Sequence, residues 1–290
     1  MIFPILGLPG PFTSWCRDVV AKCLILNGYK VTTADLSGSL ADVGRQLILG
    51  DTDHLVFSVA RPDKDLTPVL KQSNTPILLT SSDPRRAILH SVNLANMDLQ
   101  TAIRSLTGHC SCLWNFTGKD AAVDSIRFSE VLQNPHAAVQ KIADIYNLPA
   151  SQPMIDRIVL ETRPTLEAMT APENGGHDPL EELAKKFSAD EVRTIGYLFD
   201  GFERHLEGQH SAPLIVTKEL FLNGDPPHDH VAAPLDMTGR PKFIVFGPYI
   251  HIPAGTWMLR LVVSLSEEAI GTPLIIEVGA SDAAGYRELT

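Results

Sequence analysis

The sequence predicts an α/β protein with a three-layer parallel sheet, a helical extension and a small antiparallel β-sandwich-like module after it. Two observations predict this fold class. Through the first 90 residues, short apolar runs alternate with helical patterns of about ten residues. Beyond about residue 210, strand-like stretches replace helical periodicity. The length of 290 residues fits two domains, which we place at residues 1–208 and 211–290.

Four strand-like stretches supply the expected sheet, and they are Ile2–Leu8, Lys30–Leu36, His54–Val59 and Pro76–Thr80. Strands that are buried on both faces are continuously apolar, so these runs favour a parallel arrangement. Helices are expected between them, over an apolar stripe from Trp15 that ends at Asn27-Gly28, over Ser39–Leu49 and over Asp63–Gln72.

Parallel sheets of this kind bind ligands at the carboxyl ends of their strands. We therefore expect the functional site among the loops that follow the strands. These loops are Gly7–Trp15, Asp35–Ser39, Ala60–Asp63 and Thr80–Arg86.

Residues 96–208 are predicted to be mainly helical, because helix-start signals recur along them. Asn134-Pro135 and Asp178-Pro179 each place an N-cap residue before a proline at the first helical position. Ser188 and Glu191 have the spacing of a capping box. The segment Ala171–Gly176 is interpreted as a loop that acts as a mobile lid.

The β module is expected from six strand-like stretches and the turn Pro253-Ala254-Gly255. The stretches are residues 214–216, 220–222, 243–246, 249–252, 256–263 and 274–278. No helical pattern intervenes, so an antiparallel sandwich is predicted. Trp257 belongs to its core or, as the alternative, lies at an edge where its ring stacks on sugars.

The net charge of −10 is uneven, since residues 1–110 hold 10 Lys/Arg against 9 Asp and no Glu. An acidic chain is a poor binder of nucleic acid or anionic membranes, so neither is expected as a partner. No apolar run is long enough to predict a membrane span. The apolar start contains Pro4 and lacks preceding basic residues, which favours a first strand over a signal peptide.

The four cysteines show no disulfide framework, because Cys16 and Cys23 are seven residues apart on one helix and Cys110 and Cys112 form a CxC. Free thiols indicate a reducing compartment, and we expect a cytoplasmic protein. No metal site is predicted. His109-Cys110-Ser111-Cys112 is interpreted as incidental, and His228-Asp229-His230 as solvated.

The loop after the first strand reads GLPGPFTSW, from Gly7 to Trp15. A strand, a Gly/Pro loop, two hydroxyls and a helix form the layout of a phosphate cradle, in which backbone N–H groups and hydroxyls face an anion. The loop is not a Walker A motif. The alternative is that Thr13 or Ser14 only caps the helix.

Three stretches in order make residues 1–150 resemble the P-loop sulfotransferases of bacterial type. Pro9, Thr13, Ser14 and Trp15 match the family's first phosphate loop. Ser82–Ser91 is similar to its second element, an Arg-Asp/Asn-Pro with a later serine. Ile126–Pro135 and the helix that ends at Pro149 are similar to its R-x-E-x-L-x-x-x-P stretch.

The resemblance implies the P-loop sulfotransferase fold and 3′-phosphoadenylyl sulfate as co-substrate. The residues that it places at this nucleotide-type anionic ligand are Pro9, Gly10, Thr13, Ser14, Trp15, Arg85 and Ser91. The chain departs from the family pattern at three positions. Gly10 stands where the family has Lys or Arg, Phe12 replaces the loop glycine, and Ser82 replaces an arginine that binds the 3′-phosphate.

Sulfuryl transfer needs a base at the acceptor hydroxyl and a cation near the bridging oxygen. His90 and Asp35 are the candidate catalytic bases, with His54 and Asp63 as alternatives, and the cation candidates are Arg17, Arg61, Arg85 and Arg86. Each has a structural interpretation beside the functional one: the paired arginines as surface charges, His90 as a packed residue and Asp35 as a turn residue.

The sequence thus favours transfer of a sulfuryl group to a hydroxyl of a glycan or small molecule. The alternative is a catalytically inactive binding protein of the same fold, which the three departures favour. In that case carbohydrate is a candidate ligand of the C-terminal β module.

Overall fold

The computed structural model describes residues 1–49, 53–117, 123–209, 212–231, 233–236, 242–269, 271–282 and 285–288. They belong to two compact units. One contains Met1–Pro234 and Phe243–Ala254, and the other contains Leu235–Lys242 and Gly255–Thr290. The described residues from 212 to 231 therefore cluster with the α/β part of the chain.

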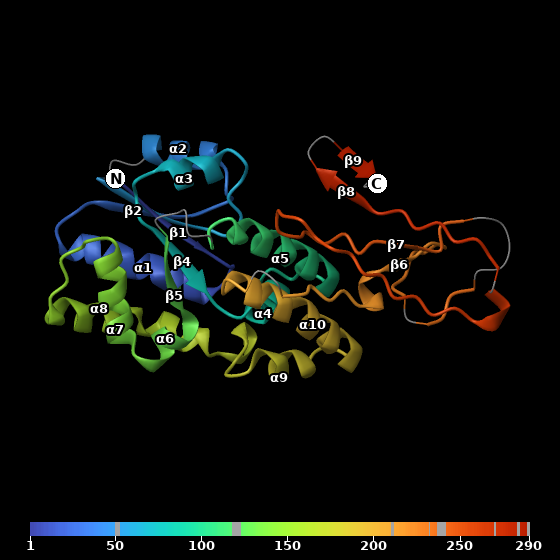
Figure 1. Cartoon of the computed structure of the whole chain (residues 1–290). Coiled ribbons are helices and arrows are strands. Elements are labelled where there is room, and N and C mark those ends of the chain that lie inside the picture. The colour runs from blue at the N-terminus through green and yellow to red at the C-terminus, as the bar shows by residue number, and fades with distance from the viewer. Residues whose placement is uncertain are drawn as a thin grey trace. The chain divides into compact units, whose positions relative to one another are not determined.

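A five-stranded parallel sheet with the order β2-β3-β1-β4-β5 forms the centre of the first unit (Figure 1). Its strands are β1 Ile2–Gly7, β2 Val31–Leu36, β3 His54–Val59, β4 Ile77–Ser81 and β5 Val123–Arg127. The predicted parallel sheet is confirmed, and the four predicted strands begin and end within about one residue of the observed bounds.

Strand β5 was missed by the sequence analysis, which treated residues 96–208 as mainly helical. Only Ile126 is buried among its five residues, so the strand has no continuous apolar run. It pairs with β4 at the edge of the sheet, where Leu79 lies opposite Ser125. An edge position leaves the polar side chains of a strand in contact with water.

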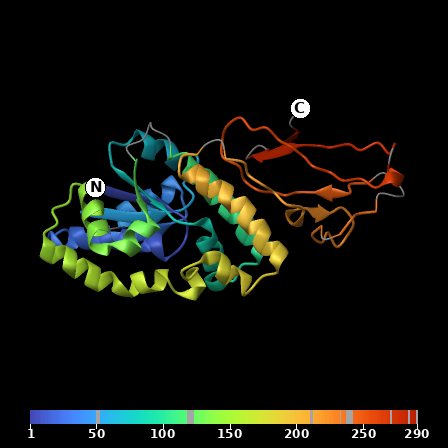
Figure 2. The ribbon, with the colours of Figure 1, turned by 60° about the horizontal axis from the view of Figure 1, so that its bottom comes forward.

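Helices cover both faces of the sheet, as strands with two buried faces require. Ile5, Val56 and Leu78 face a core shared with α1 Pro11–Leu26, α7 Pro135–Ile145 and α8 Gln152–Met169. On the opposite face, Leu6 and Phe57 pack with α3 Leu66–Gln72, α4 Pro84–Leu94, α5 Leu99–Trp114 and α10 Ala189–Leu206. Helix α10 lies alongside α5 (Figure 2).

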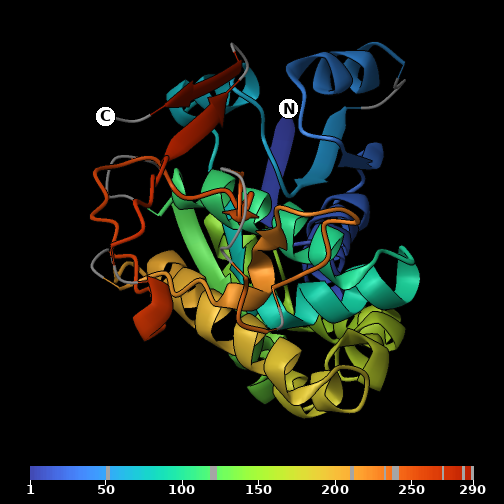
Figure 3. The same ribbon diagram turned by 90° about the vertical axis from the view of Figure 1, so that its right-hand side faces the viewer.

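The remaining elements of this unit are short. Helix α2 Leu40–Leu49 contacts β2 (Figure 3), and α6 Phe128–Gln133 follows β5 directly. The 3-10 helix η1 Pro172–Asn174 and helix α9 Pro179–Ala184 lie between α8 and α10, and η2 Lys218–Leu220 follows α10. The segment that was interpreted as a loop, Ala171–Gly176, thus contains η1.

The predicted helix starts are confirmed by their hydrogen bonds. Asn134 Oδ1 accepts from the N–H of Ala137 at 3.1 Å, and Asp178 Oδ1 accepts from the N–H of Leu180 at 2.8 Å. Ser188 and Glu191 form the reciprocal capping box. These caps satisfy N–H groups that the first turn of a helix leaves without an intrahelical partner.

Antiparallel pairing in the C-terminal part is confirmed on a small scale, while the sandwich stays a prediction. In the first unit β6 Leu222–Asn223 pairs with β7 Val245–Phe246. In the second unit β8 Gly279–Asp282 pairs with β9 Gly285–Glu288, and η3 spans Glu267–Ala269. Residues 256–263, expected as a strand, belong to none of the observed strands.

All four cysteines are free thiols, as predicted. None of the helices in the described ranges combines the length and the apolar character that crossing a membrane requires.

Replacing Gly7 with alanine is expected to destabilise the fold by about 1–3 kcal/mol, because the added methyl group overlaps the Thr80 hydroxyl. Thr80 and Thr13 are hydrogen-bonded at 2.9 Å, and both would have to move. Urea unfolding measures the change. Gly44→Ala is the control, since nothing lies within 4 Å of its added methyl group and alanine favours a helix. Equal midpoints for the two variants would contradict the expectation.

Candidate functional site

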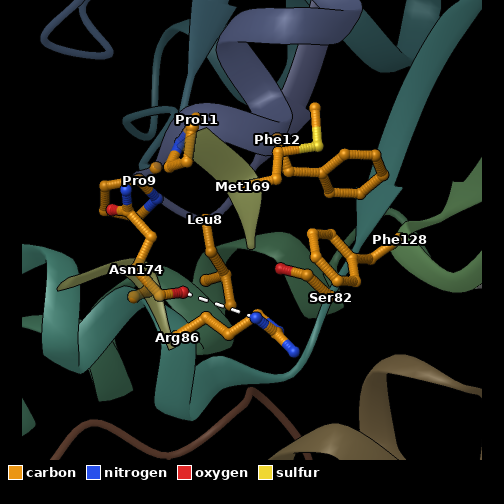
Figure 4. Close-up of a pocket in the computed structure, with 11 residues that line it drawn as sticks. Leu8, Pro9, Pro11, Phe12, Ser82, Arg86, Phe128, Met169 and Asn174 are labelled. Atoms are coloured by element: carbon orange, nitrogen blue, oxygen red, sulfur yellow. Dashed lines mark hydrogen bonds between the residues drawn. The ribbon is translucent and has the colours of Figure 1, made fainter. Parts of the chain in front are cut away.

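An open hollow lies at the carboxyl ends of β1 and β4 (Figure 4). The connection that leaves β1 runs to β2, on one side of β1 in the sheet. The connection that leaves β3 crosses β1 and runs to β4, on the other side of β1. Ligands of open α/β sheets bind where the direction of connection reverses, and the hollow occupies that position. Its lining consists of Leu8, Pro9, Gly10, Pro11, Phe12, Ser82, Arg86, Ala87, Phe128, Met169 and Asn174.

The loop between β1 and α1 forms one wall of the hollow. Gly10 has a φ of 147°, a value that side-chain-bearing residues rarely adopt. Pro11 occupies the first turn of α1, where its missing N–H costs no helical hydrogen bond. The helix therefore begins at this wall with the positive end of its dipole. Because Gly10 is tied to this backbone conformation, a lysine at the same position would be strained.

Phe12 makes the hollow partly apolar. Its side chain is 5% exposed and contacts Phe128 edge to face, with ring centroids 5.5 Å apart. Met169 lies beside them in Figure 4. Phe12 belongs to the core that α1, α7 and α8 share. The residue that replaces the family's loop glycine thus supplies a flat apolar surface in the hollow.

Arg86 supplies the positive charge of the opposite wall. Its guanidinium lies over the Phe128 ring, 4.2 Å from the centroid, and burial lowers its pKa. Nη1 donates to the carbonyl of Gly176 at 2.9 Å and more weakly to that of Asn174, and Nη2 donates to His177 at 3.2 Å. Among the described residues no partner is found for Nε, so the Nε and Nη2 edge retains donors for a ligand.

The segment Ala171–Gly176, which the sequence predicts to be a lid, is hydrogen-bonded to Arg86 in the same wall. Asn174 is 6% exposed, and its Nδ2 donates to the carbonyl of Ala168 at 3.0 Å. Its Oδ1 lies 2.9 Å from His90 Nδ1. His90, one of the two candidate bases, is therefore half-buried and bonded to the lid.

The Thr13 hydroxyl and the Trp15 side chain have structural contacts. Thr13 Oγ1 donates to the carbonyl of Leu8 at 2.7 Å and lies 2.9 Å from Thr80 Oγ1. Trp15 is fully buried, in agreement with the interpretation as a core residue. Ser14 is half-buried, and its N–H donates to the carbonyl of Gly10 at 3.4 Å.

Arg85, the predicted cofactor arginine, is surrounded by carboxylates. It is 8% exposed and pairs with Asp83 at 2.6 Å, Asp200 at 3.0 Å and Glu203 at 2.7 Å. The pairs with Asp200 and Glu203 connect α4 to α10. Ser91, on the same helix, is half-buried, and its carbonyl accepts from the N–H groups of Ala95 and Met97. Neither residue lines the hollow.

Asp35, the second candidate base, lies at the other side of the sheet. It ends β2, which is separated from β1 by β3, and it pairs with Arg17 and with the Ser58 hydroxyl. Adjacent strands are about 4.8 Å apart, so Asp35 and the hollow are separated by roughly two strand spacings. The structure therefore does not bring Asp35 and His90 together at one reacting atom.

Sequence analysis missed Phe128, Met169 and Asn174 as residues of the hollow. Phe128 follows β5, a strand that the sequence did not reveal, and Met169 ends a helix that begins 17 residues earlier at Gln152. The proline-asparagine pattern of Ala171–Gly176 indicated a lid without indicating which side chain it would insert. Arg86 was recognised as a cation candidate beside Arg85, and only its location distinguishes the two.

Comparisons with known proteins identify no family for the chain. No protein-family model and no curated protein matches it. Among solved structures, mouse sulfotransferase SULT7A1 complexed with PAP is similar, with a TM-score of 0.49 and 12% sequence identity. The alignment covers 72% of this chain and 88% of that chain.

Glu203→Gln is expected to flatten the pH dependence of stability between about pH 4.5 and 7. Burial, with a smaller effect of Asp83, raises the pKa of Glu203 from its ordinary 4.5 to about 7. The folded chain therefore binds this proton more tightly than the unfolded chain, and the free energy of unfolding falls as pH rises through that window.

Urea midpoints at several pH values test this expectation. The control is Glu167→Gln, which removes an exposed carboxylate paired only across one turn of helix α8. A Glu203→Gln profile as steep as that of the unaltered chain would show that this carboxylate does not titrate in the window.

Proposed function

We propose that this chain is a sulfotransferase-type protein that binds a nucleotide such as adenosine 3′,5′-bisphosphate and does not transfer sulfuryl groups. The observation that carries the proposal is the two-sided lining of the hollow at the reversal point of the sheet. One side is flat and apolar, and the other bears the Arg86 guanidinium.

The apolar side fits a purine ring. Phe12 and Phe128 present aromatic faces and edges in a largely desolvated setting, and Met169 adds a polarisable thioether. Leu8 extends this surface toward the end of β1. A ring that lay against these side chains would be stabilised by the apolar area that it removes from water.

The polar side fits a phosphate. The free edge of Arg86, with Nε and Nη2, can donate two parallel hydrogen bonds to phosphate oxygens, an arrangement that is stronger and more directional than a single contact. Ser82 adds a hydroxyl, and Pro9 and Gly10 bring the backbone and the start of α1 to the same hollow. The proposed phosphate site therefore keeps Pro9 and Gly10 of the loop that the sequence motif indicated, takes its charge from Arg86 and does not use the Thr13 hydroxyl.

The absence of transfer follows from where the cations lie. Stabilising the transferred group requires a positive charge at the bridging oxygen. The φ of Gly10 disfavours a lysine at the family's position, and Arg85 is engaged by Asp83, Asp200 and Glu203. Of the described residues that line the hollow, Arg86 alone bears a positive charge. Its guanidinium also donates a hydrogen bond to the carbonyl of Gly176 in the segment Ala171–Gly176.

Adenosine 3′,5′-bisphosphate is expected to bind the full chain saturably in calorimetry, and Arg86→Gln is expected to weaken the affinity by about tenfold or more. A charge-assisted, bidentate contact is worth at least about 1.4 kcal/mol, which is a factor of ten. The matched control is Arg163→Gln, an exposed arginine paired with Glu167 on α8, which should leave the affinity unchanged. No binding at millimolar nucleotide contradicts the proposal.

Incubation with radiolabelled 3′-phosphoadenylyl sulfate and a glycan and small-molecule panel separates binding from transfer. Label that remains in the nucleotide supports a binding protein. Label on any hydroxyl acceptor would establish the transferase instead, with Arg86 as the charge-stabilising residue and His90, beside the lid, as the base to be tested.

Carbohydrate binding by the C-terminal part is a second candidate, favoured by exposed aromatic side chains. Trp257 is 36% exposed, unlike the core residue that its strand pattern predicts, and Tyr249 is 59% exposed. Exposed rings stack on the apolar faces of sugars. A glycan array of the full chain tests this candidate, and Trp257→Ala should remove any signal that depends on the module.

A further inference from the structure

A second polar cluster lies on α5 and shares no residue with the hollow. Arg104, Gly108 and Cys112 follow one another at four-residue intervals and therefore lie along one face of this helix. Thr107 and Ser111 lie next to them. An amphipathic helix that is covered by other chain segments usually has an apolar stripe at the covered face. This face is polar instead.

Two further basic groups reach the same face from distant parts of the first unit. A methyl group added to Gly108 would lie 3.3 Å from Arg61 Nη1 and 3.1 Å from His251 Cδ2. Arg61 follows the carboxyl end of β3, and His251 belongs to the segment after β7. The N–H of His251 donates to Thr107 Oγ1 at 3.1 Å, which fixes that segment against α5.

Several donors in this cluster are buried without a partner. Nε and Nη2 of Arg104, Nδ1 of His109 and Oγ of Ser111 have no hydrogen-bond partner among the described residues. Arg104 is held instead by the Tyr249 ring, 5.6 Å from its guanidinium carbon. Buried polar atoms are normally satisfied, so four unsatisfied ones in this cluster require an explanation.

The cluster also lacks negative charge. None of the described carboxylates forms an ion pair with Arg61 or Arg104, whereas Arg17 and Arg85 are paired with acids. The Cys112 thiol, which is hydrogen-bonded to Arg61, has its pKa raised by burial. Burial is the main cause that lowers the pKa of His109 to about 4, and the nearby Arg61 and His251 lower it further. Burial also lowers the pKa of His251, and Arg61 has a smaller effect in the same direction. The basic groups thus act on one another without a counterion.

We propose that Arg61, Arg104, His109 and His251 form a second binding site, which takes a small oxyanion of the sulfate or phosphate type. The two unpaired nitrogens of Arg104, Nε and Nη2, lie on one edge of the guanidinium and form the fork that binds two oxygens of such an anion. The anion also supplies the missing acceptor for His109 and the missing counterion for Arg61. Gly108 allows Arg61 and His251 to approach the helix closely enough to share it.

Binding is tested with sodium sulfate on the full chain, against sodium chloride at the same ionic strength. Histidine ring resonances in NMR spectra, assigned with His109→Gln and His251→Gln variants, report on the site. Sulfate should shift the resonances of both histidines saturably and raise the pKa of His109 from about 4, because an anion stabilises the imidazolium. Titrations with phosphate and with acetate then distinguish tetrahedral oxyanions from carboxylates.

Arg61→Gln and Arg104→Gln should each weaken sulfate binding by about tenfold or more, since each removes a charge-assisted contact. Arg193→Gln, an exposed arginine on α10, is the matched control and should change nothing. Arg61 is itself exposed, so its variant should fold even if the Arg104 variant does not. Absence of saturable shifts, or shifts that persist unchanged in Arg61→Gln, would overturn the proposal.

Arg86→Gln separates this site from the hollow. It should leave the sulfate-dependent shifts of His109 and His251 intact, whatever its effect on the nucleotide. Loss of the histidine shifts in Arg86→Gln would place the anion in the hollow and would also overturn the second site.

Discussion

The architecture depends on burying the central strand β1 on both of its faces at once. Ile5 and Leu6 point to opposite sides of the sheet, and both are completely buried. Full burial of such a side chain stabilises the fold by about 1.5–3 kcal/mol, which is a large fraction of the net stability of a domain. A strand with this composition needs a strand on each side and a helical layer on each face, and the observed sheet provides both.

The position of β1 then determines the geometry of the loop that follows it. Gly7 lets the hydroxyls of Thr13 and Thr80 approach the end of the strand, where they hydrogen-bond to each other and to main-chain carbonyls. The chain leaves this contact through Gly10, in a conformation that favours glycine, and enters α1 at Pro11. Phe12 is consequently directed into the core. Loop residues that match a phosphate cradle in the sequence, such as Thr13, make packing contacts in the structure. The Arg86 guanidinium therefore supplies the positive charge of the hollow.

Neighbouring arginines illustrate how burial and charge decide the role of a residue. Arg85 and Arg86 both belong to the first turn of α4, but helix geometry rotates them by about 100° relative to each other. Arg85 points to α10, where its ion pairs with Asp200 and Glu203 connect α4 to that helix. The other points to the lid, where it meets carbonyl groups and an aromatic ring. An arginine whose partners are carbonyls keeps its net charge for a ligand, whereas one with three carboxylates does not. Arg104 on α5 and Arg61, which reaches the same helix from the loop after β3, extend this comparison, since neither is paired with a carboxylate among the described residues.

The local elements of this protein can be predicted from its residues alone, because they follow from short-range physics. Continuous apolar runs specified β1, β3 and β4, and the Asn-Pro, Asp-Pro and Ser-x-x-Glu patterns specified the helix starts. Strand β5 could not be found in this way, since only Ile126 in it is buried. The pairing of charged side chains and the set of residues that line the hollow depend on the folded chain, because those contacts join segments that are far apart in the sequence. Arg85 meets Glu203 where two helices pack, and Gly108 meets His251 where the segment after β7 packs on α5, and no local pattern encodes that packing.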